Sequence, residues 1–173
     1  LMGPNARALL QSLTPDDISN AAFPFGTSKI IEVGPTRIRA TRITYVGELG
    51  YELYIPTEFA AGLFDLIMEK GGAHGLTLAG YHAMNSLRME KAYRHWSHDI
   101  TPEDTPLEAG LGFCVAWDKK GGFTGREAMM KQREKGVTRR LAQFLISDPD
   151  AMLYHDEPIW KDGKPVMAGN KYA

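Results

Sequence analysis

The sequence has a single cysteine, Cys114, among 173 residues. One cysteine cannot form an internal disulfide, which fits a reducing compartment. No apolar run approaches the roughly 18 residues that a membrane-spanning helix needs, so we expect no membrane partner. There is also no excess of one charge sign, because 20 basic and 21 acidic residues leave a formal net charge of -1. This balance argues against a nucleic-acid partner.

The composition that remains is that of a soluble globular protein, with 43% hydrophobic and 24% charged residues. A length of 173 residues suits one domain, or one domain with part of another. The chain opens within a helical pattern and closes just after a hairpin pattern. We therefore expect it to be a fragment of a larger protein.

Helical and strand patterns follow one another and predict an α+β fold, with helices packed on an antiparallel sheet. The clearest helix is expected over 57–70, with Thr57 as its N-cap and Gly71 as its stop. The other expected elements are helices over 4–13 and 78–91 and up to Glu134, strands over 29–33, 37–45, 113–117 and 140–146, and a hairpin over 160–166.

The stretch 41–56 is predicted to be two strands joined by a turn with glycine at both ends, Gly47 and Gly50. A hairpin symmetric about this turn places Tyr45 directly opposite Glu52, on one face and roughly 5 Å apart. An aromatic plane beside a carboxylate suits a flat heterocycle whose edge carries two N–H donors, because the ring stacks while the carboxylate accepts both hydrogens. An ordinary exposed hairpin with a surface glutamate is the alternative.

Charged and aromatic side chains are densely mixed over residues 85–100, which include the end of the helix predicted over 78–91. Arg88 and Lys91 are candidates to anchor a carboxylate or a glutamyl tail of a ligand, and Trp96 is an aromatic candidate beside them. A helix face with solvated charges is the alternative. His95 and His98 lack a second ligand cluster, so we expect no metal site.

Glu108 lies between apolar residues in the run Thr105-Pro-Leu-Glu-Ala-Gly-Leu-Gly112. A buried carboxylate with a raised pKa is one interpretation. A glutamate at a helix start, satisfied by backbone N–H groups, is the favoured one. Cys114 follows in an apolar run and is expected in the core.

Taken together, these segments resemble the aminomethyltransferase (T-protein) family of the glycine cleavage system. The run Tyr45-Val-Gly-Glu-Leu-Gly-Tyr-Glu is similar to the Gly-Tyr-Thr-Gly-Glu-x-Gly-x-Glu signature of that family. Three further segments match in the same order: Ser86-Leu-Arg-Met-Glu90, the loop with Asp99-Ile-Thr-Pro and Thr105-Pro-Leu-Glu-Ala-Gly-Leu-Gly, and Phe123-Thr-Gly-Arg-Glu-Ala128. An ordered series is far more specific than any single motif.

The segment Glu90-Lys-Ala-Tyr-Arg-His-Trp-Ser-His-Asp-Ile100 looks most similar to one branch, the C-terminal folate domain of dimethylglycine and sarcosine dehydrogenases. The resemblance implies a tetrahydrofolate site in which Glu52 holds the pterin edge and Tyr45 lines the same pocket. Arg88 and Trp96 are the other candidate binding residues. It also implies that residues 1–135 are the central part of a T-protein-like folate-binding domain and that residues 136–173 are the truncated beginning of a C-terminal β-barrel.

The same resemblance implies that the intact protein transfers a one-carbon unit from a small methylamine-derived donor to tetrahydrofolate. The catalytic aspartate of the family would lie upstream of Leu1, and FAD would bind a domain further upstream. This chain alone is therefore expected to be inactive. A bacterial cytoplasm or a mitochondrial matrix is the expected location, and a homo-oligomer is compatible with the intact protein.

One departure from the family pattern leaves alternatives open. Met84 stands two residues before Ser86, where the T-protein has an arginine, which weakens the match to the glycine-cleavage reaction. The alternatives are a fragment of a glycine-cleavage aminomethyltransferase or of a folate-dependent demethylase, and a non-catalytic regulatory module on the same fold.

Overall fold

The computed structural model describes residues 1–154 and 157–166. The chain forms two compact units, Leu1–Tyr93 and Arg94–Ala173. Both contain helices and antiparallel strands, so the predicted α+β class is confirmed. The T-protein-like fold and the predicted boundary near residue 135 remain predictions.

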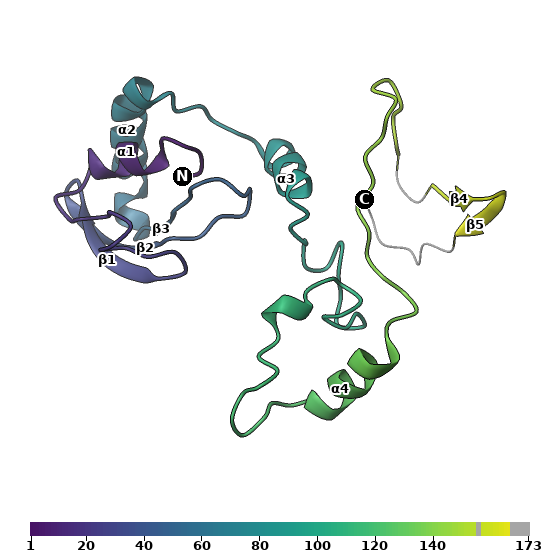
Figure 1. Ribbon diagram of the computed structural model, residues 1–173. Helices are drawn as coiled ribbons and strands as arrows, with labels where there is room; N and C mark the ends of the chain where they lie inside the picture. Colours follow the sequence, from purple (N-terminus) through teal and green to yellow (C-terminus); the bar gives the residue numbers. More distant parts are fainter. Residues whose placement is uncertain (155–156, 167–173) are drawn as a thin grey trace. The chain divides into compact units, whose positions relative to one another are not determined.

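The first unit contains an antiparallel sheet in the order β1-β2-β3, with helices α1 and α2 on one of its faces, and a further helix, α3, at the end of the unit (Figure 1). Its elements are α1 (Ala6–Gln11), β1 (Ser28–Val33), β2 (Thr36–Thr41), β3 (Glu52–Tyr54), α2 (Thr57–Gly71), the 3-10 turn η1 (Gly72–His74) and α3 (Tyr81–Glu90).

The hairpin β1–β2 is the best-defined part of the sheet. It turns at Gly34 and Pro35, and Val33 pairs with Thr36. Gly34 has a φ of 55°, and a Cβ atom there would lie 2.6 Å from a methyl carbon of Leu66. The positive φ therefore favours glycine at this turn, and a larger residue would also have to displace the Leu66 methyl group.

Strict alternation along the hairpin separates an inner face from an outer face. Ile31, Ile38 and Ala40 point inward and are buried, whereas Arg37 and Arg39 are exposed. The inner face packs with α1, α2 and the intervening loops into one core, which consists of Ala6, Leu9, Leu10, Leu13, Ile18, Phe23, Ile31, Val33, Ile38, Ala40, Tyr51, Leu63 and Ile67.

The long helix α2 is confirmed over its predicted range, but both of its ends differ in detail. At the C-terminal end it includes Gly71, and Gly72 keeps helical dihedral angles (φ -55°, ψ -40°) into η1. The N-cap position is Pro56, and Thr57 already belongs to the helix without a capping hydrogen bond from a side chain. Proline fixes φ near the required value and presents no competing N–H, so the helix begins without the predicted Thr57 cap.

The second unit contains shorter elements: the 3-10 turn η2 (Gly112–Cys114), α4 (Arg126–Lys135), β4 (Ile159–Lys161) and β5 (Lys164–Val166). The predicted helix up to Glu134 and the predicted hairpin over 160–166 are confirmed by α4 and by the pairing of β4 with β5.

Two strand predictions in this unit are wrong. The range 113–117 begins with η2, where the N–H of Cys114 donates to the carbonyl of Leu111. The range 140–146 has no strand, and its Leu141 N–H donates to the carbonyl of Glu108. An apolar run becomes a strand only with a ladder partner, and neither run has one among the described residues. Cys114 is exposed, so its predicted place in the core is also wrong.

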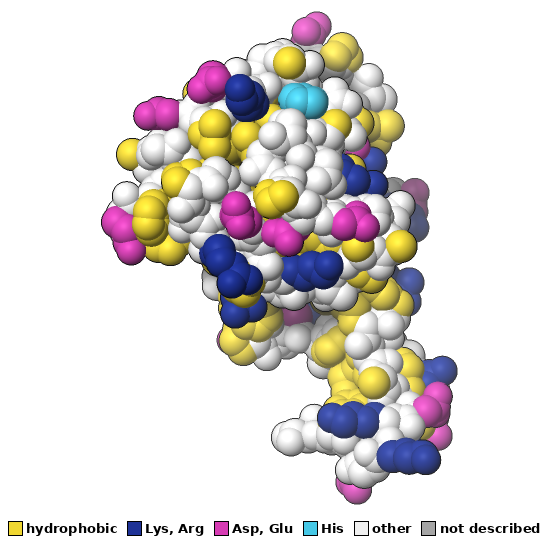
Figure 2. Space-filling view, turned by 90° about the vertical axis from the view of Figure 1, so that its left-hand side faces the viewer, with side chains coloured by type: hydrophobic (Ala, Val, Ile, Leu, Met, Phe, Trp, Pro, Cys, Tyr) yellow, Lys and Arg dark blue, Asp and Glu magenta, His cyan; other side chains and the backbone are white. Residues whose placement is uncertain are grey.

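None of the described helices has both the length and the apolar character needed to cross a lipid bilayer. On the face of the molecule drawn in Figure 2, acidic and basic side chains lie close to one another and apolar side chains are scattered among them.

Candidate functional site

The predicted pairing of Tyr45 with Glu52 is wrong in its register. In the sheet, Glu52 pairs with Thr41, and Ala40 pairs with Leu53. Strand β2 ends at Thr41, so Tyr45 belongs to the irregular loop of residues 42–51. This register places Ala40 and Leu53 on the core side together, and apolar burial favours it over the predicted register.

The loop of residues 42–51 is closed by backbone contacts near its base. The N–H of Arg42 donates to Thr27 at 2.9 Å, and the carbonyl of Arg42 accepts from Gly26 at 2.9 Å. Gly50 lies against the chain it faces, because a Cβ atom there would be 2.6 Å from the carbonyl oxygen of Ile43. The loop therefore folds back on its own backbone, and only glycine fits at position 50.

The N-terminal residues hold the other side of this loop. The N–H of Gly3 donates to the carbonyl of Leu49 and that of Tyr51 to the carbonyl of Leu1, both at 2.8 Å. Met2 and Gly50 form an antiparallel bridge. Tyr51 is fully buried beside Phe23, with ring centroids 5.7 Å apart. Glu52 thus follows a rigidly held residue, as a binding group requires.

Glu52 and Tyr54 share the outer face of β3, as strand alternation predicts. The Tyr54 hydroxyl donates to Glu52 Oε2 at 2.5 Å. Glu52 Oε1 accepts no hydrogen bond from any described residue, and no described arginine or lysine forms an ion pair with this carboxylate. The hydrogen bond to Glu52, and then the negative charge of the carboxylate, raise the pKa of Tyr54.

Arg88 is buried, and its guanidinium serves the end of α3. Its Nε donates to Asn85 Oδ1 at 2.7 Å, and its Nη1 donates to the carbonyl of Tyr93 at 3.0 Å. A cation near the last helical carbonyls also interacts favourably with the helix dipole. The predicted contact of Arg88 with a ligand remains a prediction, and its observed contacts fix the residues that follow the helix.

Lys91, at the end of α3, lies over the loop of residues 42–51. A Cβ atom on Gly47 would be 2.4 Å from Lys91 Cγ and 2.8 Å from Cδ. Gly47 has a φ of 75°. The aliphatic stem of the lysine therefore packs on bare backbone, while the residue as a whole remains exposed. No sequence pattern predicts this contact, because it joins residues far apart in the chain.

Trp96 belongs to the second unit and is 59% exposed. It lies in a tight turn in which the N–H of His95 donates to Asp99 Oδ2 at 2.8 Å and that of Ser97 donates to the carbonyl of Ile100. The imidazole rings of His95 and His98 lie 4.2 Å apart. Within residues 1–154 and 157–166, no group of three His, Cys, Asp or Glu side chains is arranged to hold a metal ion.

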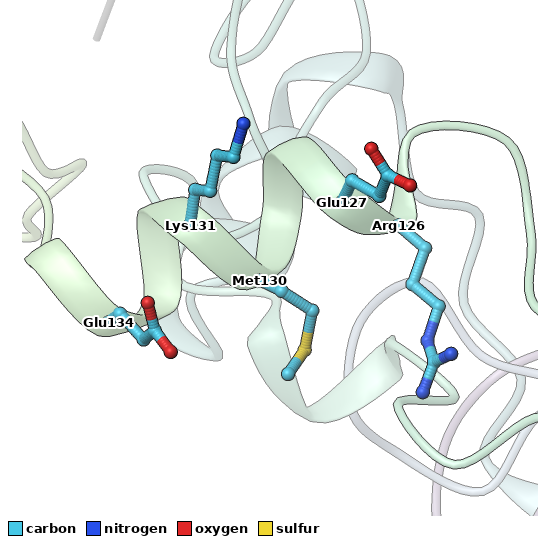
Figure 3. Close-up of a pocket in the computed structure, with 5 residues that line it drawn as sticks. All are labelled: Arg126, Glu127, Met130, Lys131 and Glu134. Carbon is cyan, nitrogen blue, oxygen red and sulfur yellow. The ribbon is translucent and has the colours of Figure 1, made fainter.

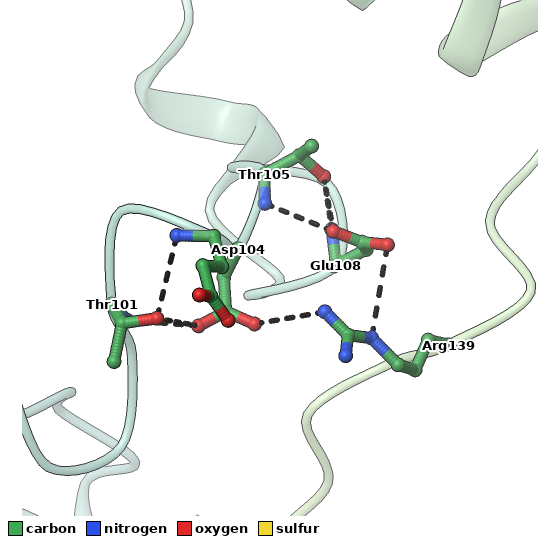
Figure 4. A network of polar contacts seen from close by, with 6 residues as sticks. Thr101, Asp104, Thr105, Glu108 and Arg139 are labelled. Carbon is green, nitrogen blue, oxygen red and sulfur yellow. Dashed lines mark hydrogen bonds and ion pairs between the residues drawn. The ribbon is translucent and has the colours of Figure 1, made fainter. Parts of the chain in front are cut away.

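In each of two consecutive turns of the second unit, a carboxylate accepts a hydrogen bond from the threonine three residues earlier (Figure 4). Asp104 Oδ2 accepts from the Thr101 N–H at 2.8 Å, and Glu108 Oε2 accepts from the Thr105 N–H at 2.9 Å. Arg139 bridges both carboxylates, at 3.2 Å from Asp104 and 3.9 Å from Glu108. We call these five residues the threonine–carboxylate cluster.

The hydrogen bonds from the backbone N–H and the hydroxyl of Thr105, with a smaller contribution from Arg139, hold the pKa of Glu108 below its usual value. The predicted backbone N–H contact of Glu108 is therefore confirmed, whereas the predicted helix start and the raised pKa are not, because residues 106–110 form turns. The capping pair, a threonine followed three residues later by a glutamate, is a signal that the sequence does carry.

A shallow depression on α4 is lined by Arg126, Glu127, Met130, Lys131 and Glu134 (Figure 3). All five come from one helix, and α4 has no buried residue. Ligand sites are usually concave and formed by several elements with convergent polar groups, so this depression is not a candidate site.

Comparisons with known proteins extend over almost the whole chain. A family model described as the GCVT N-terminal domain matches residues 1–119. The mitochondrial sarcosine dehydrogenase of Homo sapiens is 44% identical over 166 residues, which are 96% of this chain and 18% of that protein.

Two relatives of other kinds match as well. The mitochondrial pyruvate dehydrogenase phosphatase regulatory subunit of Mus musculus is 37% identical over 169 residues, covering 95% of this chain and 19% of that protein. An aminomethyltransferase of Caldanaerobacter subterraneus is 39% identical over 144 residues, covering 83% of this chain and 38% of that protein. The chain thus spans well under half the length of each of these three relatives.

Proposed function

Since this chain belongs to the GCVT N-terminal domain family, we propose that it forms part of a tetrahydrofolate-binding site. In this proposal the intact protein is a flavoenzyme of the dimethylglycine or sarcosine dehydrogenase kind. It passes a one-carbon unit from a methylamine-derived donor to tetrahydrofolate. FAD binds other parts of that enzyme, and the intact protein works in a mitochondrial matrix or a bacterial cytoplasm.

The observation that carries the proposal is the state of Glu52. Its carboxylate is half-buried on a short strand that follows the fully buried Tyr51, and its Oε1 atom accepts no hydrogen bond from the described residues. A pterin carries N3–H and a 2-amino group as adjacent donors, and a carboxylate offers two matching acceptors. A carboxylate with an open oxygen and no salt bridge to a described arginine or lysine therefore fits a pterin edge.

The other predicted site residues receive subordinate roles in this proposal. Tyr45 lies in the loop of residues 42–51, which directly precedes Glu52 in the sequence, and in this proposal it supplies an aromatic face. Lys91 offers an exposed ammonium group to a carboxylate of the ligand, and the buried Arg88 fixes the helix end that carries it. Trp96 is an exposed residue of the second unit, and its contact with the ligand stays a prediction.

The test is a calorimetric titration of this chain with tetrahydrofolate. Calorimetry is preferable to tryptophan fluorescence, because Trp96, Trp117 and Trp160 all belong to the second unit whereas Glu52 belongs to the first. We expect saturable binding that Glu52→Ala weakens by at least about 30-fold, since a charge-assisted contact is worth about 2 kcal/mol.

Glu32→Ala is the matched control, because Glu32 is an exposed glutamate on the outer face of the same sheet. It should leave the affinity unchanged. Equal binding by the two alanine variants would overturn the assignment of Glu52, and an absence of saturable binding by this chain would overturn the proposal for it.

A regulatory module without chemistry of its own is the second candidate function. The observation that favours it is the 37% identity to a protein whose name describes a regulatory subunit. Steady-state assays of the intact protein with dimethylglycine and with sarcosine separate the two. Turnover that requires tetrahydrofolate supports the enzyme, whereas folate binding without turnover supports the module.

A further inference from the structure

We propose that Tyr54 is a positioning residue that orients the Glu52 carboxylate toward a ligand edge with two N–H donors. This inference rests on the proposed function of Glu52. It adds a residue to the site and states which feature of the ligand the site distinguishes, namely the amino group next to the ring N–H.

The geometry of β3 gives Tyr54 this role. Residues two apart on a strand point to the same face, so the phenol extends along the strand toward Glu52. The donated hydrogen bond of 2.5 Å is at the short limit for O–H···O contacts and involves a charged acceptor. Tyr54 itself is 53% exposed. The phenol therefore contributes little to the core, and its defined polar contact is with Glu52.

The polar side chains next to Glu52 on the sheet donate their hydrogen bonds to a residue other than Glu52. Thr41 pairs with Glu52 across the sheet, but its hydroxyl donates to Ser28 Oγ at 3.1 Å. Arg39 pairs with Tyr54, and its guanidinium donates to the same Ser28 oxygen at 3.3 Å. Both side chains are thus directed across the sheet toward β1. Among the described side chains, the Tyr54 phenol donates the hydrogen bond that the Glu52 carboxylate accepts, and the charge of the Leu1 ammonium acts on the same carboxylate.

This arrangement predicts selectivity for a ligand with paired donors. The Tyr54 hydroxyl occupies one lone pair of Oε2, which leaves Oε1 and the second lone pair of Oε2 for two parallel N–H donors. Holding the carboxylate in one orientation before binding reduces the rotamer entropy that is lost on binding. A ligand with a single donor at this edge gains less, because it does not need both oxygens in one plane.

The first measurement compares Tyr54→Phe with the parent chain by calorimetry. We expect tetrahydrofolate to bind about 3- to 10-fold more weakly, as the loss of one hydrogen bond predicts. Tyr154→Phe is the control, because Tyr154 is an exposed tyrosine of the other unit. It should bind as the parent chain does.

The second measurement uses a tetrahydrofolate analogue that lacks the 2-amino group. The parent chain should prefer tetrahydrofolate over this analogue, and the preference should fall at least about 3-fold in Tyr54→Phe. A variant that merely loosened the strand would weaken both ligands equally. Equal weakening would therefore overturn the positioning role.

A spectroscopic measurement tests the contact without any ligand. The ¹³Cζ resonance of Tyr54, assigned by its loss in Tyr54→Phe, should move in Glu52→Ala and remain in place in Glu32→Ala. An unchanged resonance in Glu52→Ala would overturn the inference. If tetrahydrofolate fails to bind at all, the proposed function fails and the role of Tyr54 fails with it. Binding that depends on Glu52 and ignores Tyr54→Phe would overturn the role of Tyr54 alone.

Discussion

The two units of the chain are stabilised in different ways. In the first unit, residues from α1, the sheet and α2 form a continuous apolar core, and Leu10, Phe23 and Tyr51 have no exposed surface. In the described part of the second unit, the buried set contains Ala109 alone. Many of its large apolar side chains are exposed, including Phe113 at 83% and Leu145 at 96%.

The second unit is held together mainly by local polar contacts. In the second unit the threonine–carboxylate cluster joins residues 101–108 to Arg139, and the Leu141 N–H donates to the carbonyl of Glu108. Such contacts are individually worth about 1 kcal/mol, whereas a buried aromatic side chain is worth several. The comparison teaches that the rigid support for Glu52 comes from the core of its own unit.

The largest expected effect is that of Phe23→Ala. Phe23 is fully buried against Tyr51, and we expect the free energy of unfolding of the first unit to fall by about 3–5 kcal/mol. Phe113→Ala, which truncates an exposed ring of the second unit, should change stability by less than about 0.5 kcal/mol. Urea denaturation followed by circular dichroism measures both. Similar losses from the two variants would contradict the comparison.

An intermediate effect is expected for Gly50→Ala. The new methyl group would lie 2.6 Å from the Ile43 carbonyl oxygen and 3.1 Å from Thr44 Cβ, so we expect a loss of about 1–3 kcal/mol. Gly62→Ala is the matched control, because no atom lies within 4 Å of its Cβ position in α2. It should stabilise the chain by up to about 1 kcal/mol. Thermal melting of both variants tests the pair, and a neutral Gly50→Ala would refute the close approach.

The smallest effect concerns acid pH and the second unit. Because the pKa of Glu108 is lower in the folded chain than in the unfolded chain, its stabilising contribution is present above the unfolded value of about 4.3 and is lost as the pH falls through the folded value. The amide resonance of Thr105 should therefore shift as the pH falls from about 6 to about 3, and that of Ile31 should not.

Glu108→Gln is the control for this titration, since it removes the ionisable group and keeps the shape of the side chain. The shift of the Thr105 amide should then disappear over the same pH range. A Thr105 resonance that titrates equally in the variant would assign the effect to another acid.

Local patterns predicted the elements that depend on neighbours in sequence. The hairpin around Gly34, the helix from Thr57, α4 and the hairpin over 160–166 all follow from turn residues and periodicity, and the structure confirms them. The family assignment is confirmed as well, because it rested on an ordered series of motifs. Each of these features is encoded within a few consecutive residues.

The features that sequence reasoning missed depend on contacts between distant segments. The register of Glu52 with Thr41 is fixed by which residues reach the core and by the pairing of Leu1–Gly3 with Leu49–Tyr51. The contact of Lys91 with Gly47 joins α3 to a loop more than forty positions earlier. The hydrogen bond of Tyr54 to Glu52 could have been predicted from the sequence, because strand alternation places both residues on one face.

The closed loop of residues 42–51 also bears on how such a site can diversify. Thr41 and Glu52 pair at its base, and Gly50 folds onto Ile43 just above them. The tip between Ile43 and Gly50 is thus a cassette whose ends are already joined, and doubling the length of a flexible loop costs only about 0.6 kcal/mol. Insertions and exchanges at the tip can therefore change this loop while leaving the pairing of Glu52 with Thr41 intact.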